Sequence, residues 1–353
     1  MLIVAGLSLK NLEPRVWDPA SPFHIPALSA VMVSYGELHQ MQFMRSAAMK
    51  VGLRAYLGVP GRISIYLDNG AFYFASQGGD APIDEYEEFV EATKPDWKPI
   101  PQDYIPFPSM SRQKRRGCFE KTMRVNLQYQ HNGYVPVVHI GTHLLDYTER
   151  VAADSRLSKK PWIAMGGIVP NLLRKPKAMP YSDILAGLLH VRTIFAKKQM
   201  HVFGVGGTST LHLTALLGLD SVDSSGWRNR AARGIVQLPG CGDRLIADLG
   251  KWRGRSPSRS EWKTLAACQC PACRLHGVKG LKANKLHGFC CRATHNLWVL
   301  LEENLWLEQQ ISAETYSCNY AARVDNSTYR PIIDELLELL KSTRSGRVER
   351  GNK

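Results

Sequence analysis

A repeated alternation of short apolar runs with helix-like stretches restricts the fold of this chain more than any other feature. The runs are rich in β-branched residues and cover residues 30–34, 63–67, 135–140, 162–165, 201–203 and 219–222, and a short one precedes Gln102. Helical patterns lie between them, at residues 37–52, 83–93, 112–131, 144–155, 182–198 and 209–217. Such alternation predicts a parallel sheet covered by helices. Seven or eight such units favour an α/β fold of the TIM type, a (β/α)8 barrel.

Most of the apolar runs end at a polar residue or a glycine. In a parallel barrel the loops after the strands carry the chemistry, because the carboxyl ends of all strands meet on one face. A single polar residue at such a point is most often a turn residue or a helix cap. The full set argues for a functional site, and it comprises Asp68, Asp103, His139, Gly166, Gly167, Gly204 and Asp223.

Three thiols lie close together in the last third of the chain, at Cys268, Cys270 and Cys273. Zn²⁺ prefers four Cys or His ligands in a tetrahedron, so a fourth ligand must come from further along the chain. His295 could supply it, and the alternatives are His276, His287, Cys290 and Cys291. Because four protein ligands leave no open position on the ion, we expect a structural zinc.

The character of the chain changes after about residue 250. Residues 252–259 are rich in Arg, Ser, Pro and Gly and predict an exposed linker, and apolar helices are expected near 296–309 and 330–341. We therefore expect a barrel domain at 1–260 and a zinc-binding subdomain with C-terminal helices at 261–345. A basic tail should follow at 346–353.

The charge favours a polyanionic partner. Lys and Arg number 45 against 31 acidic residues, and the net charge is +14. Basic residues cluster at 114–116 and 253–259, which makes nucleic acid the expected partner. No secretory signal is recognisable and no run approaches about 18 apolar residues, so we expect a cytoplasmic protein with no membrane partner.

Four blocks of the sequence match motifs of one known family. Cys268-x-Cys270-x-x-Cys273 followed by Thr294-His295-Asn296-Leu297 looks like its zinc signature. Residues 201–206 with 218–223 resemble the block that leads to its nucleophilic aspartate, and residues 68–72 resemble the Asp-Ser-Gly-Gly-Phe block of its second catalytic aspartate. Residues 162–168 resemble the segment whose Gly-Gly backbone contacts the base. Over residues 60–310 the chain thus resembles the tRNA-guanine transglycosylase (queuine tRNA-ribosyltransferase) superfamily.

The resemblance implies a base exchange with named roles. Asp223 would be the nucleophile and Asp68 the general acid/base. Base exchange with retention at one anomeric carbon needs a covalent intermediate and a group that gives and takes a proton, and two carboxylates can supply both. The remaining roles are base reading by Asp103 and His139, backbone contacts from Gly166, Gly167 and Ile168, and stacking by Phe72 and Phe203. Phosphate contacts are expected from Arg228, Arg230 and Arg233.

Two departures from the tRNA enzymes lie where base and polynucleotide are held. Residues 224–230 replace a Cys followed by a Pro-Thr-Arg run, and His139-Ile140-Gly141 replaces a Gln-Gly-Gly. Both resemble the DpdA branch, which places 7-deazaguanine bases into DNA. The leading hypothesis is therefore exchange of guanine in DNA for a preQ0-type 7-deazaguanine. The alternatives are a queuine- or archaeosine-type enzyme acting on tRNA and a non-catalytic nucleic-acid-binding paralogue, and a homodimer or an accessory protein is a possible further partner.

Overall fold

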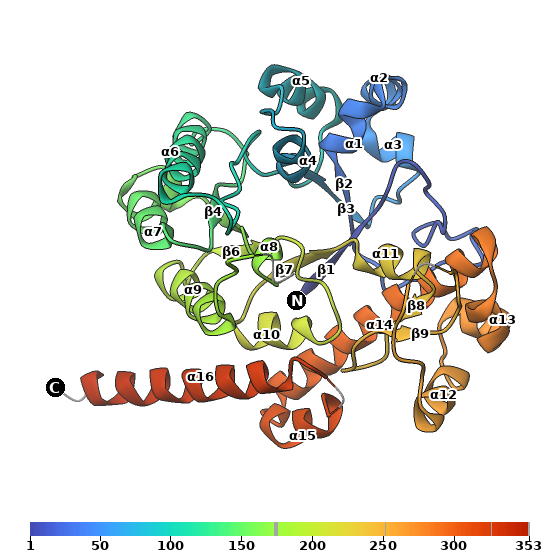
Figure 1. Cartoon of the computed structure of the whole chain (residues 1–353). Coiled ribbons are helices and arrows are strands. Elements are labelled where there is room, and N and C mark those ends of the chain that lie inside the picture. Colours follow the sequence, from blue (N-terminus) through green and yellow to red (C-terminus); the bar gives the residue numbers. More distant parts are fainter. Residues whose placement is uncertain (173–175, 251, 326, 352–353) are drawn as a thin grey trace.

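The computed structural model describes residues 1–172, 176–250, 252–325 and 327–351 (Figure 1). Its centre is a seven-stranded sheet in the order β3-β2-β1-β7-β6-β5-β4, and every neighbouring pair is parallel. The parallel α/β fold predicted from the sequence is therefore confirmed. The strands are β1 Leu2–Gly6, β2 Ala30–Ser34, β3 Ser64–Asp68, β4 Val137–His139, β5 Trp162–Gly166, β6 Gln199–Val202 and β7 Ser221–Ser224.

The sheet curls, and a non-strand segment lies between its two edge strands. Trp97 forms a parallel bridge with Tyr66 of β3, and Pro99 forms one with Val135, just before β4. Backbone hydrogen bonds support both bridges, from Leu67 N to Trp97 O at 2.9 Å and from Val135 N to Lys98 O at 3.0 Å. Because the prolines at 99 and 101 in this segment have no N–H to donate, a regular ladder cannot form there. The complete eight-stranded barrel is thus not established, and the eighth position holds isolated bridges.

The strand at the centre of the sheet was missed by the sequence analysis. β1 lies between β2 and β7, and Ile3 to Gly6 are buried. A strand buried on both faces has a continuous apolar sequence without alternation, so its period does not distinguish it from other apolar runs.

Helices surround the sheet (Figure 1). The predicted helix at 37–52 is broken at Met41, whose ψ of 70° is not helical. The helices of this part are α1 Tyr35–Gln40, α2 Gln42–Val51, α3 Leu53–Leu57, α4 Ala71–Ser76, α5 Ile83–Thr93, α6 Arg112–Gln128, α7 Leu144–Ala153, α8 Val169–Leu172, α9 Tyr181–Ile194, α10 Thr210–Leu216 and α11 Gly226–Ala232, with a 3-10 turn at Leu157–Lys159.

After α11, the described part of the chain forms a small hairpin and five helices. The hairpin pairs β8 Ile235–Val236 with β9 Arg244–Leu245. The helices are α12 Arg259–Ala266, α13 Pro271–Lys282, α14 Lys285–Ser312, α15 Tyr316–Arg323 and α16 Arg330–Gly351. α14 begins well before the predicted residue 296, because the Cys/His segment itself is helical there. α16 continues through the predicted basic tail to Gly351, and residues 352–353 lie outside the described residues.

α14 ties the C-terminal helices to the sheet. Asn304 Nδ2 donates to the Met1 carbonyl at 2.9 Å, and the Met1 ammonium pairs with Glu308. His212 of α10 contacts the buried Glu303 carboxylate at 2.8 Å, and Arg323 of α15 pairs with the same carboxylate. The domain boundaries at residues 260 and 345 stay a prediction. None of the helices in the described ranges has the length and apolar character that a membrane span requires.

Candidate active site and metal centre

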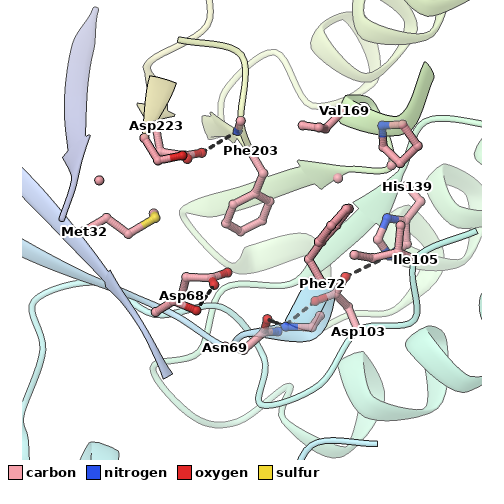
Figure 2. A pocket seen from close by; sticks show the side chains of 18 of the residues that line it. Met32, Asp68, Asn69, Phe72, Asp103, Ile105, His139, Val169, Phe203 and Asp223 are labelled. Carbon is pink, nitrogen blue, oxygen red and sulfur yellow. Dashed lines mark hydrogen bonds and ion pairs between the residues drawn. The ribbon is translucent and has the colours of Figure 1, made fainter. Parts of the chain in front are cut away.

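A pocket of about 350 Å³ opens at the carboxyl ends of the strands. The strand ends contribute Gly6, Ser34, Asp68, His139, Gly166 and Asp223 to its lining. Figure 2 shows Asp68 and Asp223 on one side of this pocket and Asp103 with His139 on the other. Strand ends that are far apart in the sequence, from Gly6 to Asp223, thus converge on one face, as the sequence predicts.

Asp68 is the last residue of β3, and Ser34, its partner in the register, ends β2. Ser34 Oγ donates to Asp68 Oδ2 at 2.7 Å, and the Gly70 N–H donates to the same oxygen at 3.1 Å. Burial raises the pKa of Asp68 to about 6, the Ser34 hydrogen bond opposes this, and the negative charges of Asp223 and Asp103 raise it further. Asp68 can therefore hold or release a proton near neutral pH.

Asp223 lies on β7 and its side chain is 15% exposed. The Gly204 N–H donates to Oδ1 at 2.6 Å. Among the described residues Oδ2 has no hydrogen-bond partner, so one carboxylate oxygen is fixed and the other faces the pocket free. This is a suitable arrangement for an oxygen nucleophile.

His201 lies beneath Asp223, inside the curled sheet, and no role was predicted for it from the sequence. Its ring is buried, Nε2 lies 3.5 Å from Asp223 Oδ1, and Nδ1 lies 2.9 Å from Ser221 Oγ. The ring also packs against Trp97 and Phe203, with centroids 4.8 Å away in each case. His201 thus places a buried ring nitrogen beside the carboxylate. Its place three residues before Gly204, in the block that resembles the family's nucleophile segment, was the available sequence signal.

Asp103 and His139 form a pair on the opposite wall. His139 Nε2 lies 3.1 Å from Asp103 Oδ2, and Asn69 Nδ2 donates to Asp103 Oδ1 at 2.8 Å. Because each carboxylate oxygen accepts two hydrogen bonds, both still have a free lone pair for a base N–H. A Cβ on Gly166 would lie 2.9 Å from His139 Nδ1, so only glycine allows the imidazole this position. His139, predicted to read the base, lies against Asp103 on this wall, and its role in base reading stays a prediction.

The predicted stacking and backbone residues divide between the pocket and the core. Phe72 is half exposed, Phe203 is partly buried, and both rings point into the pocket between its two acidic sides (Figure 2). Gly166 and Gly167 line the pocket. Ile168 does not, because its side chain faces a separate apolar cavity under α9.

The three predicted phosphate contacts are unequal. Arg228 is buried, and its guanidinium donates to the backbone carbonyls of Asn11 and Glu13. It is therefore a structural residue, and the proposed phosphate contact does not fit it. Arg230 pairs with Asp243, with 2.6 Å between Nε and Oδ1. Arg233 is exposed and its guanidinium stacks 4.0 Å from the centre of the Trp252 ring, so it is the one best placed to reach a polyanion.

Four predicted ligands converge beside a small separate core. His295 Nδ1 lies 3.4 Å from Cys268 Sγ, 4.0 Å from Cys270 Sγ and 3.5 Å from Cys273 Sγ. Tetrahedral Zn²⁺ with ordinary bond lengths places neighbouring N and S ligands about 3.6 Å apart, so the set fits the ion. Nε2 of His295 lies 3.0 Å from the Gln237 carbonyl, which leaves Nδ1 free to bind metal.

The local sequence explains how the thiols are held. Cys270 caps α13, its Sγ accepts from the Cys273 N–H at 3.3 Å, and Pro271 starts the helix. His295 comes from α14 on the other side. The cluster can bind a metal ion through His295, and none of the alternative fourth ligands belongs to it. We call residues 259–295 the Cys/His lobe.

The comparisons with known proteins agree with the resemblance. No model of a known protein family matches the chain. It is 25% identical over 254 residues to a tRNA-guanine(15) transglycosylase of Haloarcula marismortui, covering 70% of this chain and 47% of that protein. It is 23% identical over 332 residues to a protein of the same name from Korarchaeum cryptofilum, covering 85% of this chain and 50% of that protein.

The chain thus spans about half the length of these curated relatives. Both alignments support the resemblance to the tRNA-guanine transglycosylase superfamily. Both relatives are named for tRNA, so the comparisons favour the tRNA alternative over the DNA-directed hypothesis.

Proposed function

We propose that this pocket exchanges a guanine base of a nucleic acid for another purine-like base, through a covalent intermediate on Asp223. The observation that carries the proposal is the pair of dissimilar carboxylates in one pocket. Asp223 has one free oxygen, and the pKa of Asp68, raised mainly by burial, lies at about 6. A double displacement at one carbon needs these two properties.

Each half of the proposed exchange balances. In the first half, Asp223 Oδ2 attacks C1′ of the nucleotide, the C1′–N9 bond breaks, and Asp68 gives its proton to the leaving guanine. In the second half, Asp68 takes the N9 proton of the incoming base, that nitrogen attacks C1′, and the bond to Asp223 breaks. Two inversions return the original configuration, and Asp68 ends as it began.

The opposite wall supports base recognition. The edge of guanine presents N–H donors, and Asp103 offers acceptor lone pairs while Asn69 and His139 hold it in place. Phe72 and Phe203 provide aromatic faces for a base that has been flipped out of its stack. The incoming base is proposed to be a 7-deazaguanine, since such a base keeps the edge that Asp103 reads.

The nucleic acid is proposed to be tRNA, following the names of the relatives. DNA is the second candidate, because residues 224–230 and His139 depart from the tRNA-type sequence at the positions next to the nucleophile and the base-reading wall. The net charge of +14 suits either polyanion.

The test incubates the full chain with labelled guanine or a labelled preQ0-type base and, separately, with tRNA, duplex DNA and an RNA duplex of the same sequence. Label should enter one of them, and a denaturing gel should show a covalent protein–nucleic acid adduct. Asp223→Asn keeps the acceptor for Gly204 but removes the nucleophile, so label transfer should fall on the order of 10³-fold or more and the adduct should vanish.

The outcomes separate the alternatives. Label in tRNA alone or in DNA alone assigns the substrate. Transfer by Asp223→Asn at the wild-type rate would show that the nucleophile is another residue. Binding of nucleic acid without label or adduct under every condition would favour the non-catalytic paralogue.

A further inference from the structure

Three of the four alternative fourth ligands of the first metal centre form a separate cluster. His276 of α13 faces His287 and Cys291 of α14, and their ligand atoms all lie within 4.8 Å of one another. Cys291 Sγ lies 3.7 Å from His287 Nε2. The two imidazole rings are perpendicular, at 86°, with centroids 4.5 Å apart. The cluster shares no residue with the centre at Cys268, Cys270, Cys273 and His295.

The backbone brings these three side chains together. His287 and Cys291 are four residues apart on one helix, a spacing that places two ligands on the same face. Gly280 lies opposite them, and a Cβ there would lie 2.5 Å from His276 Cβ and 3.0 Å from Cys291 Sγ. A side chain at position 280 would therefore force His276 and Cys291 apart.

The donor set and spacing match a metal ion that takes nitrogen and sulfur ligands. Tetrahedral Zn²⁺ separates an imidazole nitrogen from a thiolate by about 3.6 Å, close to the observed His287–Cys291 distance. Cys291 is buried, His276 is partly exposed and His287 is exposed, so a fourth position would open toward solvent. Cys291 and His295 are four residues apart, so one face of α14 serves both clusters about 6 Å apart along the helix.

We propose that His276, His287 and Cys291 form a second metal site, which takes Zn²⁺ or an ion of the same ligand preference with a water molecule as fourth ligand. The ion would join the middle of α13 to the start of α14. This proposal is independent of the proposed function, because the packing and the ligand distances that support it do not involve the pocket.

The experiment measures Zn²⁺ bound per chain by titrating the full-length protein against a chromogenic chelator, with elemental analysis of the saturated protein. Wild type should bind about two ions per chain, and His287→Ala should bind about one. Because His287 is exposed, its replacement leaves the fold intact, which circular dichroism checks. His131→Ala, an exposed histidine remote in sequence from both clusters, is the matched control and should keep both ions.

Co²⁺ loading tests the thiolate directly. Cys291→Ala should lose part of the thiolate-to-Co²⁺ charge-transfer absorption, whereas Cys290→Ala, the neighbouring buried thiol, should retain all of it. Equal Zn²⁺ binding by wild type and His287→Ala would overturn the proposal. So would a Co²⁺ spectrum that Cys291→Ala leaves unchanged.

Discussion

The pocket and the Cys/His lobe use polar side chains in opposite ways. In the lobe, three thiols and an imidazole point at one common centre, and the outer nitrogen of His295 is tied to a backbone carbonyl. In the pocket, three carboxylates share one cavity, and no Lys or Arg is among the described residues that line it. The lobe has a ligand set that a cation could neutralise, and a bound metal ion would stabilise the fold. The pocket places three carboxylates together, and burial with the two neighbouring charges raises the pKa of Asp68, which costs stability when that group ionises.

The largest effect on stability is expected from removing a candidate metal ligand of the lobe. Cys273→Ala removes a buried ligand, so the protein should lose the metal of the first centre and several kcal/mol of stability, with a fall in Tm of roughly 10 °C or more. Activity should fall with the fold rather than by a separate effect. Elemental analysis, thermal unfolding and label transfer measure the three quantities. Cys318→Ala removes an exposed thiol outside both clusters and is the control, and a Cys273→Ala protein with unchanged Tm would contradict a stabilising role for the lobe.

Asp68→Asn should show the reverse pattern, with lost activity and gained stability. Without the proton donor, label transfer should fall about 10²- to 10⁴-fold. The folded protein holds the Asp68 proton up to a pKa of about 6 against an ordinary value of 3.8, so the wild-type free energy of unfolding declines as pH rises through that window. Asn cannot ionise, so the variant should be more stable at pH 8 by up to about 3 kcal/mol and should lose this advantage below about pH 4.

Denaturant unfolding at pH 4 and pH 8 measures the difference between wild type and Asp68→Asn. Asp325→Asn, a carboxylate with 67% exposure, is the control and should change stability by less than about 0.5 kcal/mol at either pH. If Asp68→Asn were less stable than wild type at pH 8, ionised Asp68 would not destabilise the folded protein, and the proposed electrostatic cost of the pocket would be wrong.

A smaller effect, on the reaction rate alone, is expected from replacing His201 in the pocket. His201→Phe keeps a ring among Trp97 and Phe203 but removes the nitrogen beside Asp223, so the rate of adduct formation should fall roughly tenfold, equivalent to about 1.4 kcal/mol. KM should change little, because His201 lies beneath the nucleophile and outside the pocket lining. Ser221→Ala removes only the hydroxyl that contacts Nδ1 of His201. Rapid quench-flow measurements should give this variant a near wild-type rate of adduct formation. A wild-type rate in His201→Phe would make His201 a packing residue only.

The same contrast explains what the sequence could predict. The four candidate metal ligands lie in one segment, so the spacing predicts the three thiols, and the family resemblance selects His295 from several possible fourth ligands. The pocket is assembled from strand ends between residues 6 and 225, and only those with a family-like motif or an obvious strand end were found. Ser34, Asn69 and His201 were missed, because their roles come from side chains that register and curvature bring into contact.

The errors have equally local causes. Arg228 belongs to a basic run, yet the helix α11 turns it toward two backbone carbonyls that need donors. The eighth strand was expected from the rhythm of the chain, and two prolines limit it to isolated bridges. Charge and rhythm predict the class of structure well, but neither specifies where a single side chain points.

The central place of β1 has a consequence for how the chain folds during its synthesis. β1 precedes both of its neighbours along the chain, so one of its edges can pair early with β2, but the other waits for β7, which ends at Ser224. At about 5–20 residues per second that edge stays open for roughly ten to forty seconds. An unpaired apolar edge is a site of aggregation, so the nascent chain is most vulnerable in this interval. The sheet therefore forms through contacts of high sequence separation, and we expect slow folding that profits from chaperones.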